Sequence, residues 1–376
     1  MKLTLLSILM APLAIVLALH PRATILFSGD AMQHKAQIES ARQPDGTYSY
    51  SNCFIPVADI ISSADYSVVN LETPLGGKPY RGYPCFSAPD SFAFALRDAG
   101  FDLMLTANNH TLDAGYKGLS RTISVLDSLG VDHIGTYHNA AHREQSLPLV
   151  KDINGFKIGF LNYTYGTNGF TPSGGVVVDY IDRSVIAEDI KEARDKGAEI
   201  ICVSVHWGDE YKLLPNESQK SLAKFLCEQG VDIIFGGHPH VIQPMEVIEN
   251  EVTGRKTALI YSLGNFISNM KTRDTRGGAI ALVTLQRNSI GRAEVKSLAY
   301  RTVFTDSSDF TLYPSEQLPS GRMTANRDAF VESAESIFQR HNRNIDAWPK
   351  HPRVQGEISA PDSTGIFSEI LKIFTK

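Results

Sequence analysis

Two histidines separated by one proline are the sharpest chemical feature of this sequence. His238 and His240 follow the apolar run 231–235 and a Gly-Gly pair. Neutral imidazoles in a tight loop can occupy adjacent positions around a divalent transition metal. A His-x-His pair alone is a weak signal, because many such pairs lie in surface loops. The pair predicts a metal site only if further ligands converge on it.

Further ligand-type residues follow other strand-like runs. Short β-rich apolar runs alternate with helix-like stretches along the chain, which is typical of an α/β protein. In such sheets the carboxyl ends of the strands form the crevice where ligands bind. We therefore expect one shared metal site, whose predicted ligands are Asp30, Glu72, Asn109, His206, His238 and His240.

The donor atoms of this set indicate the kind of metal. Two carboxylates, one amide oxygen and three imidazoles suit Mn, Fe or Zn better than an all-oxygen Mg cage. A carboxylate can also bridge two cations about 3.5–4 Å apart, which together polarise an ester and activate water. The sequence predicts one or two divalent ions.

His110 has two interpretations. Beside a metal-binding Asn109, it can act as the catalytic proton donor to a leaving group. Alternatively, His110 and Asp113 cap and order the loop that enters the next helix, because they are three residues apart. We favour the catalytic interpretation.

Apolar periodicity and following glycines predict the elements that position these residues. The predicted helices are 91–99, 118–129, 184–196, 217–229 and 326–340, and a hairpin is expected over 247–259. Antiparallel strands are expected over 278–285 and 293–300.

The chain divides into three parts by composition. The apolar run in residues 1–20 predicts a signal peptide or an N-terminal membrane anchor, and hence an exported protein, either periplasmic, extracellular or anchored. One large domain is expected over 22–305, and a helical extension over 306–376. The last part contains a linker-like stretch at 356–363 and an apolar helix face at 366–374, expected to dock on its own domain. An exported context permits a disulfide between Cys53 and Cys85.

The charge of the chain argues against nucleic acid as a partner. The formal net charge is -5 at pH 7, with acidic and basic residues mixed. Nucleic-acid binding needs a basic stripe, so no nucleic acid is expected as a partner. The sequence also contains no G-x-x-x-x-G-K-[ST] phosphate loop.

Six ordered motifs give the sequence a resemblance to the CapA-type capsule (poly-gamma-glutamate) synthesis proteins, within the calcineurin-like metallophosphoesterase superfamily. The motifs are FSGDAM (27–32), VNLETP (69–74), TANNH (106–110), VHWGDEY (205–211), GHPHV (237–241) and SLGNF (262–266). The resemblance implies an α/β fold of four layers, with two mixed β-sheets flanked by helices. It also implies Glu72 as a bridging carboxylate, and Asn109 and His110 as the family's Asn-His pair.

The sequence departs from the wider superfamily at two positions. Met32 stands where the ordinary phosphoesterase motif has a histidine, and a thioether is a poor ligand for these cations. His34 is therefore a possible additional ligand. Glu72 replaces the usual Asp, so phosphatase activity does not follow from the scaffold alone.

Three functions remain open. The first is an exported metal-dependent hydrolase or transferase acting on a cell-surface polymer, with gamma-linked glutamate suggested by the resemblance. The second is a metal-dependent phosphoesterase, and the third is a non-catalytic polymer-binding or assembly component of a membrane-bound synthesis and export complex. The residues predicted to bind substrate are Asn70, Asn108, Tyr165, Asn168, Glu210 and Asn265.

Overall fold

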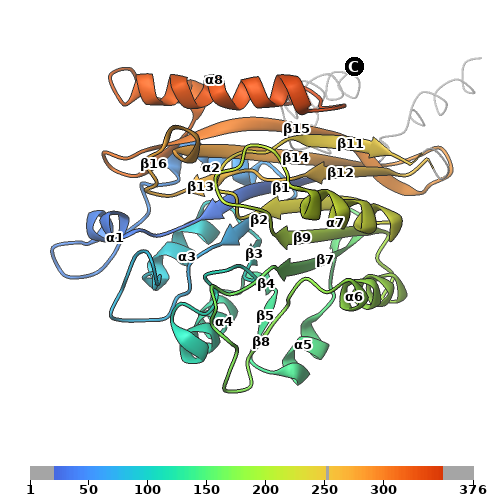
Figure 1. The fold of residues 1–376 in the computed structure, drawn as a ribbon, viewed down its shortest axis with the longest axis horizontal. Helices are drawn as coiled ribbons and strands as arrows, with labels where there is room; N and C mark the ends of the chain where they lie inside the picture. The colour runs from blue at the N-terminus through green and yellow to red at the C-terminus, as the bar shows by residue number, and fades with distance from the viewer. Residues whose placement is uncertain (1–20, 251–253, 350–376) are drawn as a thin grey trace, which may run out of the picture.

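Two mixed β-sheets, packed face to face and flanked by helices, form the centre of the protein (Figure 1). The structure is a computed structural model that describes residues 21–250 and 254–349. The expected signal peptide or anchor (1–20) and the expected linker and apolar helix of the tail lie outside these residues. Within them, no helix is long and apolar enough to cross a membrane.

The larger sheet is parallel on one side of β1 and antiparallel on the other. Its strands, in spatial order, are β16 (Thr311–Pro314), β15 (Ala293–Asp306), β14 (Gly277–Arg287), β1 (Arg22–Ala31), β2 (Tyr66–Leu71), β3 (Leu103–Leu105) and β4 (Asp132–Ile134). A short strand, β13 (Asn265–Ile267), pairs in parallel with the end of β1. The expected antiparallel strands over 278–285 and 293–300 correspond to β14 and β15.

The smaller sheet has four parallel strands between two antiparallel edge strands. Its spatial order is β11 (Met245–Glu249), β12 (Lys256–Ile260), β10 (Ile233–Gly237), β9 (Ile200–His206), β7 (Phe156–Thr164) and β6 (Leu149–Ile153). The expected hairpin over 247–259 is the pair β11 and β12. A separate two-stranded sheet joins β5 (Thr136–Tyr137) to β8 (Val177–Val178).

Side-chain alternation along the strands produces the layers. In β1, Ile25 and Phe27 pack into the core between the sheets, whereas Leu26 belongs to the cluster on the outer face. Successive strand residues point to opposite faces, so a strand buried on both sides is apolar throughout. The ring of Phe27 meets that of Phe235 across the interface, with centroids 5.2 Å apart.

Helices cover the outer face of each sheet and complete the four predicted layers. On the larger sheet lie α2 (Ile55–Ser62), α3 (Asp90–Asp98) and α4 (Gly115–Leu129), and on the smaller sheet α6 (Arg183–Asp195) and α7 (Glu217–Glu228). The shorter elements are α1 (Lys35–Ala41), α5 (Ala140–Ser146), η1 (Arg273–Thr275) and η2 (Ser315–Gln317). Helices α3, α4, α6 and α7 match the predicted ranges to within three residues.

The chain beyond residue 305 continues the same sheet. Strand β16 pairs with the end of β15, and α8 (Thr324–His341) runs along β15 at one side of the molecule (Figure 1). Phe330 and Phe338 of α8 pack against Phe304 and Tyr300 of β15. The part of the extension that the structure describes is therefore joined to the domain core.

The disulfide that an exported context permits is not formed. Cys53 and Cys85 are free thiols, as are the other two cysteines.

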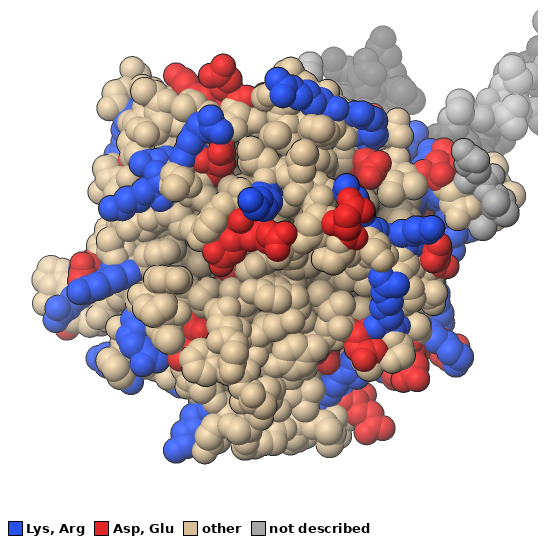
Figure 2. Space-filling view, in the orientation of Figure 1, with Lys and Arg blue, Asp and Glu red and all other residues tan. Residues whose placement is uncertain are grey.

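The surface charge is mixed. On the face shown in Figure 2, acidic and basic side chains are interspersed, and a group of acidic side chains lies near the centre.

Candidate metal centre

The polar residues that end separate strands meet where the two sheets come together. Asp30 is near the end of β1, and Glu72 directly follows β2. From the smaller sheet, His206 ends β9, and His238 and His240 follow β10. All five are at most 3% exposed. The two carboxylates and three imidazoles predicted to converge are therefore close together in a buried site.

Glu72 belongs to two overlapping groups of potential metal ligands. In one group, ligand atoms of Asp30, Glu72 and His206 lie within 4.8 Å of one another, and in the other, those of Glu72, His238 and His240 do. Glu72 Oε1 is 3.4 Å from His206 Nε2 and 3.7 Å from His240 Nε2. A carboxylate shared by two ligand groups has the position that is needed to bridge two cations.

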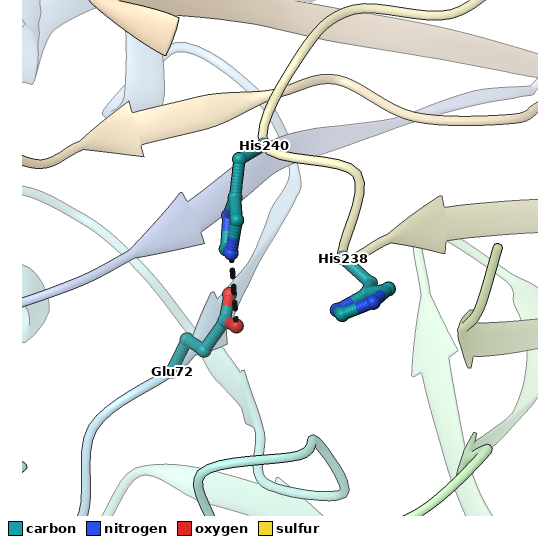
Figure 3. A group of neighbouring side chains, drawn as sticks. All are labelled: Glu72, His238 and His240. Carbon is teal, nitrogen blue, oxygen red and sulfur yellow. Dashed lines mark ion pairs between the residues drawn. The ribbon is translucent and has the colours of Figure 1, made fainter. Parts of the chain in front are cut away.

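The chemistry of the second group fits a divalent ion. Figure 3 shows the side chains of His240 and Glu72 pointing toward each other, with His238 beside them on the loop that follows β10. Glu72 Oε1 and His238 Nδ1 are buried and have no hydrogen-bond partner. Orphaned buried polar atoms are costly unless something binds them. Carboxylate oxygen together with imidazole nitrogen suits Mn, Fe or Zn.

Neighbouring amides orient the ligands of the first group. Asn109 Oδ1 is 2.9 Å from His206 Nε2, which places this predicted ligand beside the imidazole. Asn70 donates from Nδ2 to Asp30 Oδ1 at 2.7 Å. Asp30 Oδ2 also accepts from the backbone N–H of His238 at 3.3 Å, so the two sheets are connected at the site itself.

The loop after β10 adopts a backbone that few side chains tolerate. His238 has φ 98° and His240 has φ 56°, both in the left-handed region. Such conformations cost of order 1–3 kcal/mol and occur mainly at functional sites. Gly237 is required for a different reason, because a Cβ there would lie 2.8 Å from Asp30 Oδ1. The sequence Gly-Gly-His-Pro-His therefore lets the backbone pass close to the carboxylate.

The two carboxylates have opposite pKa shifts. Burial alone would raise the pKa of Asp30, but the hydrogen bond and charge of His240 and the charge of His206 outweigh it and hold the pKa below its usual range. Burial and the charge of Asp30 raise the pKa of Glu72 well above its usual range. Glu72 therefore holds a proton more readily than a free glutamate does, and a cation that binds here competes with that proton.

Two of the imidazoles are held in the neutral form that binds metals. Burial, followed by the charge of His238, places the pKa of His206 well below its ordinary value. Burial and the charge of His240 lower the pKa of His238 to about 4. Both rings therefore carry one unprotonated nitrogen at neutral pH, and on His206 a metal would compete with the contacts to Asn70 and Asn109.

His110 forms a pair with a buried carboxylate beside this centre. Its Nδ1 lies 2.7 Å from Asp113 Oδ2, and that oxygen also accepts from the backbone N–H of Phe86 at 2.7 Å. The ring of Phe86 packs against the imidazole at 4.6 Å. Nδ1 is thereby occupied, Nε2 is left for other contacts, and Asp113 can stabilise a protonated ring. The pair fits both interpretations of His110, since Asp113 orders the loop and also orients the imidazole.

Sequence comparison decides the family. The model of the family described as "Bacterial capsule synthesis protein PGA_cap" matches residues 24–270. This range contains every residue of the centre. The chain belongs to the PGA_cap family. It is 30% identical over 279 residues to the PGA biosynthesis protein CapA of Bacillus subtilis, covering 72% of this chain and 69% of that protein. It is 27% identical over 291 residues to the capsule biosynthesis protein CapA of Bacillus anthracis, covering 74% and 67%.

Solved structures with some likeness to this PGA_cap protein include a nucleotidase and a phosphoesterase. The NAD nucleotidase of Haemophilus influenzae has a TM-score of 0.48 at 12% identity, covering 87% of this chain and 57% of that one. The calcineurin-like phosphoesterase YfkN of Bacillus subtilis has a TM-score of 0.42 at 13% identity, covering 85% and 99%.

The asparagines predicted to bind substrate are bonded within the PGA_cap site. Asn108 donates to Asn70 Oδ1 at 3.2 Å, and Asn265 Oδ1 lies 3.1 Å from His240 Nδ1. Asn168 Oδ1 accepts from Asn109 Nδ2 at 3.3 Å. These contacts orient metal ligands, and direct contact of the asparagines with substrate stays a prediction.

His34 is placed apart from the ligand groups. It caps α1 in a capping box with Gln37, and its Nδ1 lies 3.3 Å from the backbone N–H of Asn269. Within the part of the chain that the structure describes, neither ligand group includes His34 or the buried Met32. These contacts engage Nδ1, so a role for His34 as an additional ligand, through Nε2, stays a prediction.

Exposed side chains surround the buried centre, and sequence reasoning found only some of them. Tyr165 and Glu210 are exposed, as a substrate contact requires. Tyr211 and Tyr83 were not predicted. Tyr211 ends the motif at 205–211, which is a usable signal, whereas Tyr83 lies in a loop with no signal that connects it to the site.

Proposed function

We propose that this PGA_cap protein is an exported metal-dependent hydrolase or transferase that acts on a cell-surface polymer during capsule or poly-gamma-glutamate synthesis. One observation carries the proposal: two buried groups of metal-type ligands share Glu72, beside the His110–Asp113 pair. Glu72 Oε1 and His238 Nδ1 are buried without a hydrogen bond, which a bound cation would explain. The polymer class is suggested by the names of the two CapA relatives.

Each group in the site has a chemical task in this proposal. Bound divalent ions supply Lewis-acid polarisation and lower the pKa of water. Asp30, Glu72, Asn109 and the three histidines hold those ions. His110 Nε2 delivers a proton to the leaving atom, and Asp113 keeps the imidazole oriented and stabilises its charged form.

Location and partners follow from the same proposal. The apolar run in residues 1–20 would direct the chain out of the cytoplasm and either be removed or remain as an anchor. A protein that handles a growing surface polymer would act next to a membrane-bound synthesis and export complex. The interspersed surface charge in Figure 2 offers no broad basic face on the side shown for a nucleic-acid partner.

Metal analysis of purified protein tests the proposal without a known substrate. We expect Mn, Fe or Zn to copurify, and Glu72→Ala and His238→Ala to lose the metal. His110→Ala should keep the metal but lower turnover of a gamma-linked glutamate polymer by about 10²–10⁴-fold, the usual contribution of a general acid. His341→Ala, at an exposed position on α8, is the matched control. Wild-type activity in metal-free Glu72→Ala would contradict the proposal.

A phosphoesterase is the second candidate, because a shared carboxylate between two ligand groups also suits phosphoester cleavage. The same preparations should then hydrolyse an aryl phosphate in Mn-containing buffer, in a manner that depends on His110. Binding of polymer that survives both Glu72→Ala and His110→Ala would instead indicate a non-catalytic assembly component.

A further inference from the structure

Three exposed tyrosines surround the mouth of the metal centre, and we call them the tyrosine rim. Tyr165, Tyr211 and Tyr83 are 48%, 53% and 73% exposed. The ring of Tyr165 lies 4.6 Å from that of His238, and the ring of Tyr211 lies 6.3 Å from that of His240. Two of these exposed rings therefore lie directly beside imidazoles of the ligand groups.

Tyr83 completes the rim on the side of His110. Its ring lies 6.3 Å from Phe86, which in turn packs on His110 at 4.6 Å. Tyr83 therefore lies on the proton-donor side of the centre, whereas Tyr165 and Tyr211 lie on the metal-ligand side.

The backbone fixes two rim residues to the centre itself. The N–H of Tyr211 donates to the carbonyl of Pro239, between the two loop histidines, at 2.8 Å, and Tyr211 has φ 64°. The N–H of Tyr165 donates to the carbonyl of His206 at 3.0 Å. A strained conformation next to a site indicates that the side chain must be aimed in a particular direction.

The rim includes a carboxylate. Exposed Glu210 directly precedes Tyr211 in the chain. Burial first, and then Glu210, raises the pKa of both Tyr165 and Tyr211 to about 12, and the charge of Glu210 also reaches Glu72 and His238. Glu210 therefore lies within reach of both rim tyrosines and of the metal ligands.

Tyrosine rings next to a carboxylate favour a positively charged ligand. Tyrosine rings attract ammonium groups through their negative faces, and a nearby carboxylate adds a direct ion pair. A purely anionic ligand would instead be repelled by Glu210. A divalent ion held by the ligand groups would attract anionic oxygens, so the rim and the metal centre would favour opposite charges.

We propose that the tyrosine rim and Glu210 bind an ammonium group of the substrate, so that the centre accepts zwitterionic ligands whose anionic group faces the metal. This inference rests on the proposed function for the metal side only. Two sources share the chemistry, namely the free amino end of a peptide-like polymer and an aminoalkyl phosphate.

Calorimetric titration of the Mn-loaded protein with matched probes tests the inference. Gamma-glutamylglutamate is compared with its N-acetyl form, and O-phosphoethanolamine with ethyl phosphate, because each pair differs by the ammonium group. We expect the ammonium-bearing member of at least one pair to bind about tenfold more tightly, the order expected for a cation–π contact with an ion pair. The pair that shows the preference identifies the source.

Variants separate the rim from the metal centre. Glu210→Gln and Tyr211→Leu should lose the preference, whereas Tyr211→Phe keeps the ring and should retain most of it. Phe94→Leu, at a 40% exposed aromatic on α3, is the control and should change nothing. Metal content should equal that of the wild type in all four variants.

The outcomes distinguish this inference from the proposed function. Equal binding of both members of both pairs, or a preference that Glu210→Gln leaves intact, would overturn the inference even if the metal is present. A rim-dependent preference in a protein that holds metal but turns over no substrate would support the inference and remove the proposed enzymatic function.

Discussion

Among the single residues, His34 shows how burial controls charge in this fold. Burial lowers its pKa from 6.5 to about 4, although the hydrogen bond with Gln37 acts to raise it. The unfolded chain therefore binds a proton at pH values where folded His34 stays neutral. The contribution of His34 to stability is complete above about pH 6.5 and is lost progressively as the pH falls toward 4.

His34→Gln should flatten this pH dependence. Between about pH 7 and about pH 4.5, the unfolding free energy of the metal-free variant should fall by about 2 kcal/mol less than that of the wild type, since one pKa unit equals about 1.4 kcal/mol. Urea unfolding at the two pH values measures the difference. His341→Gln on the surface should behave like the wild type, and parallel losses in all three proteins would contradict the assignment.

At the level of elements, the position of Asp30 depends on how closely β1 approaches the segment before β13. Asp30 N–H donates to the carbonyl of Gly264 at 2.9 Å. A Cβ on the preceding Gly29 would lie only 1.9 Å from that same carbonyl oxygen, and Gly264 itself has φ 67°. The strand and the segment can meet only because both positions are glycine.

Gly29→Ala should therefore separate β1 from this segment. We expect a loss of about 1–3 kcal/mol in the free energy of unfolding, as for other overpacked sites, together with reduced metal content because Asp30 moves. Denaturant titration and elemental analysis measure the two effects. Gly166→Ala is the matched control, since nothing lies within 4 Å of a Cβ there and its φ is not positive. Unchanged stability and metal content in Gly29→Ala would show that the contact is not required.

The same elements show what the sequence could and could not predict. Helices such as α4 were predictable because local signals mark them, and Gly130 ends that helix with φ 66°. The convergence of His206, His238 and His240 on Glu72 was predictable from strand ends alone. The pairing of β1 with β14, far away in the chain, is set by non-local packing. Tyr83 was missed for the same reason, since only the folded chain places it, through Phe86, on the side of His110.

For the molecule as a whole, α8 decides whether the chain beyond residue 305 is an appendage or part of one cooperative unit. Phe338 is 2% exposed, its ring lies 4.3 Å from that of Tyr300, and it belongs to the core between the sheets. A segment that shares this core should unfold together with it. Truncation of a buried phenylalanine typically costs 3–5 kcal/mol.

Phe338→Ala should accordingly lower the free energy of unfolding by about 3–5 kcal/mol in a single transition. Metal content per folded molecule should not change, because Phe338 lies in neither ligand group. Urea titrations followed by circular dichroism and by fluorescence should coincide, while Phe94→Ala, at a 40% exposed position, should cost less than about 1 kcal/mol. If α8 instead melted in an early separate step and left the rest at wild-type stability, it would be an independent extension. The stability of the metal centre would then be independent of α8.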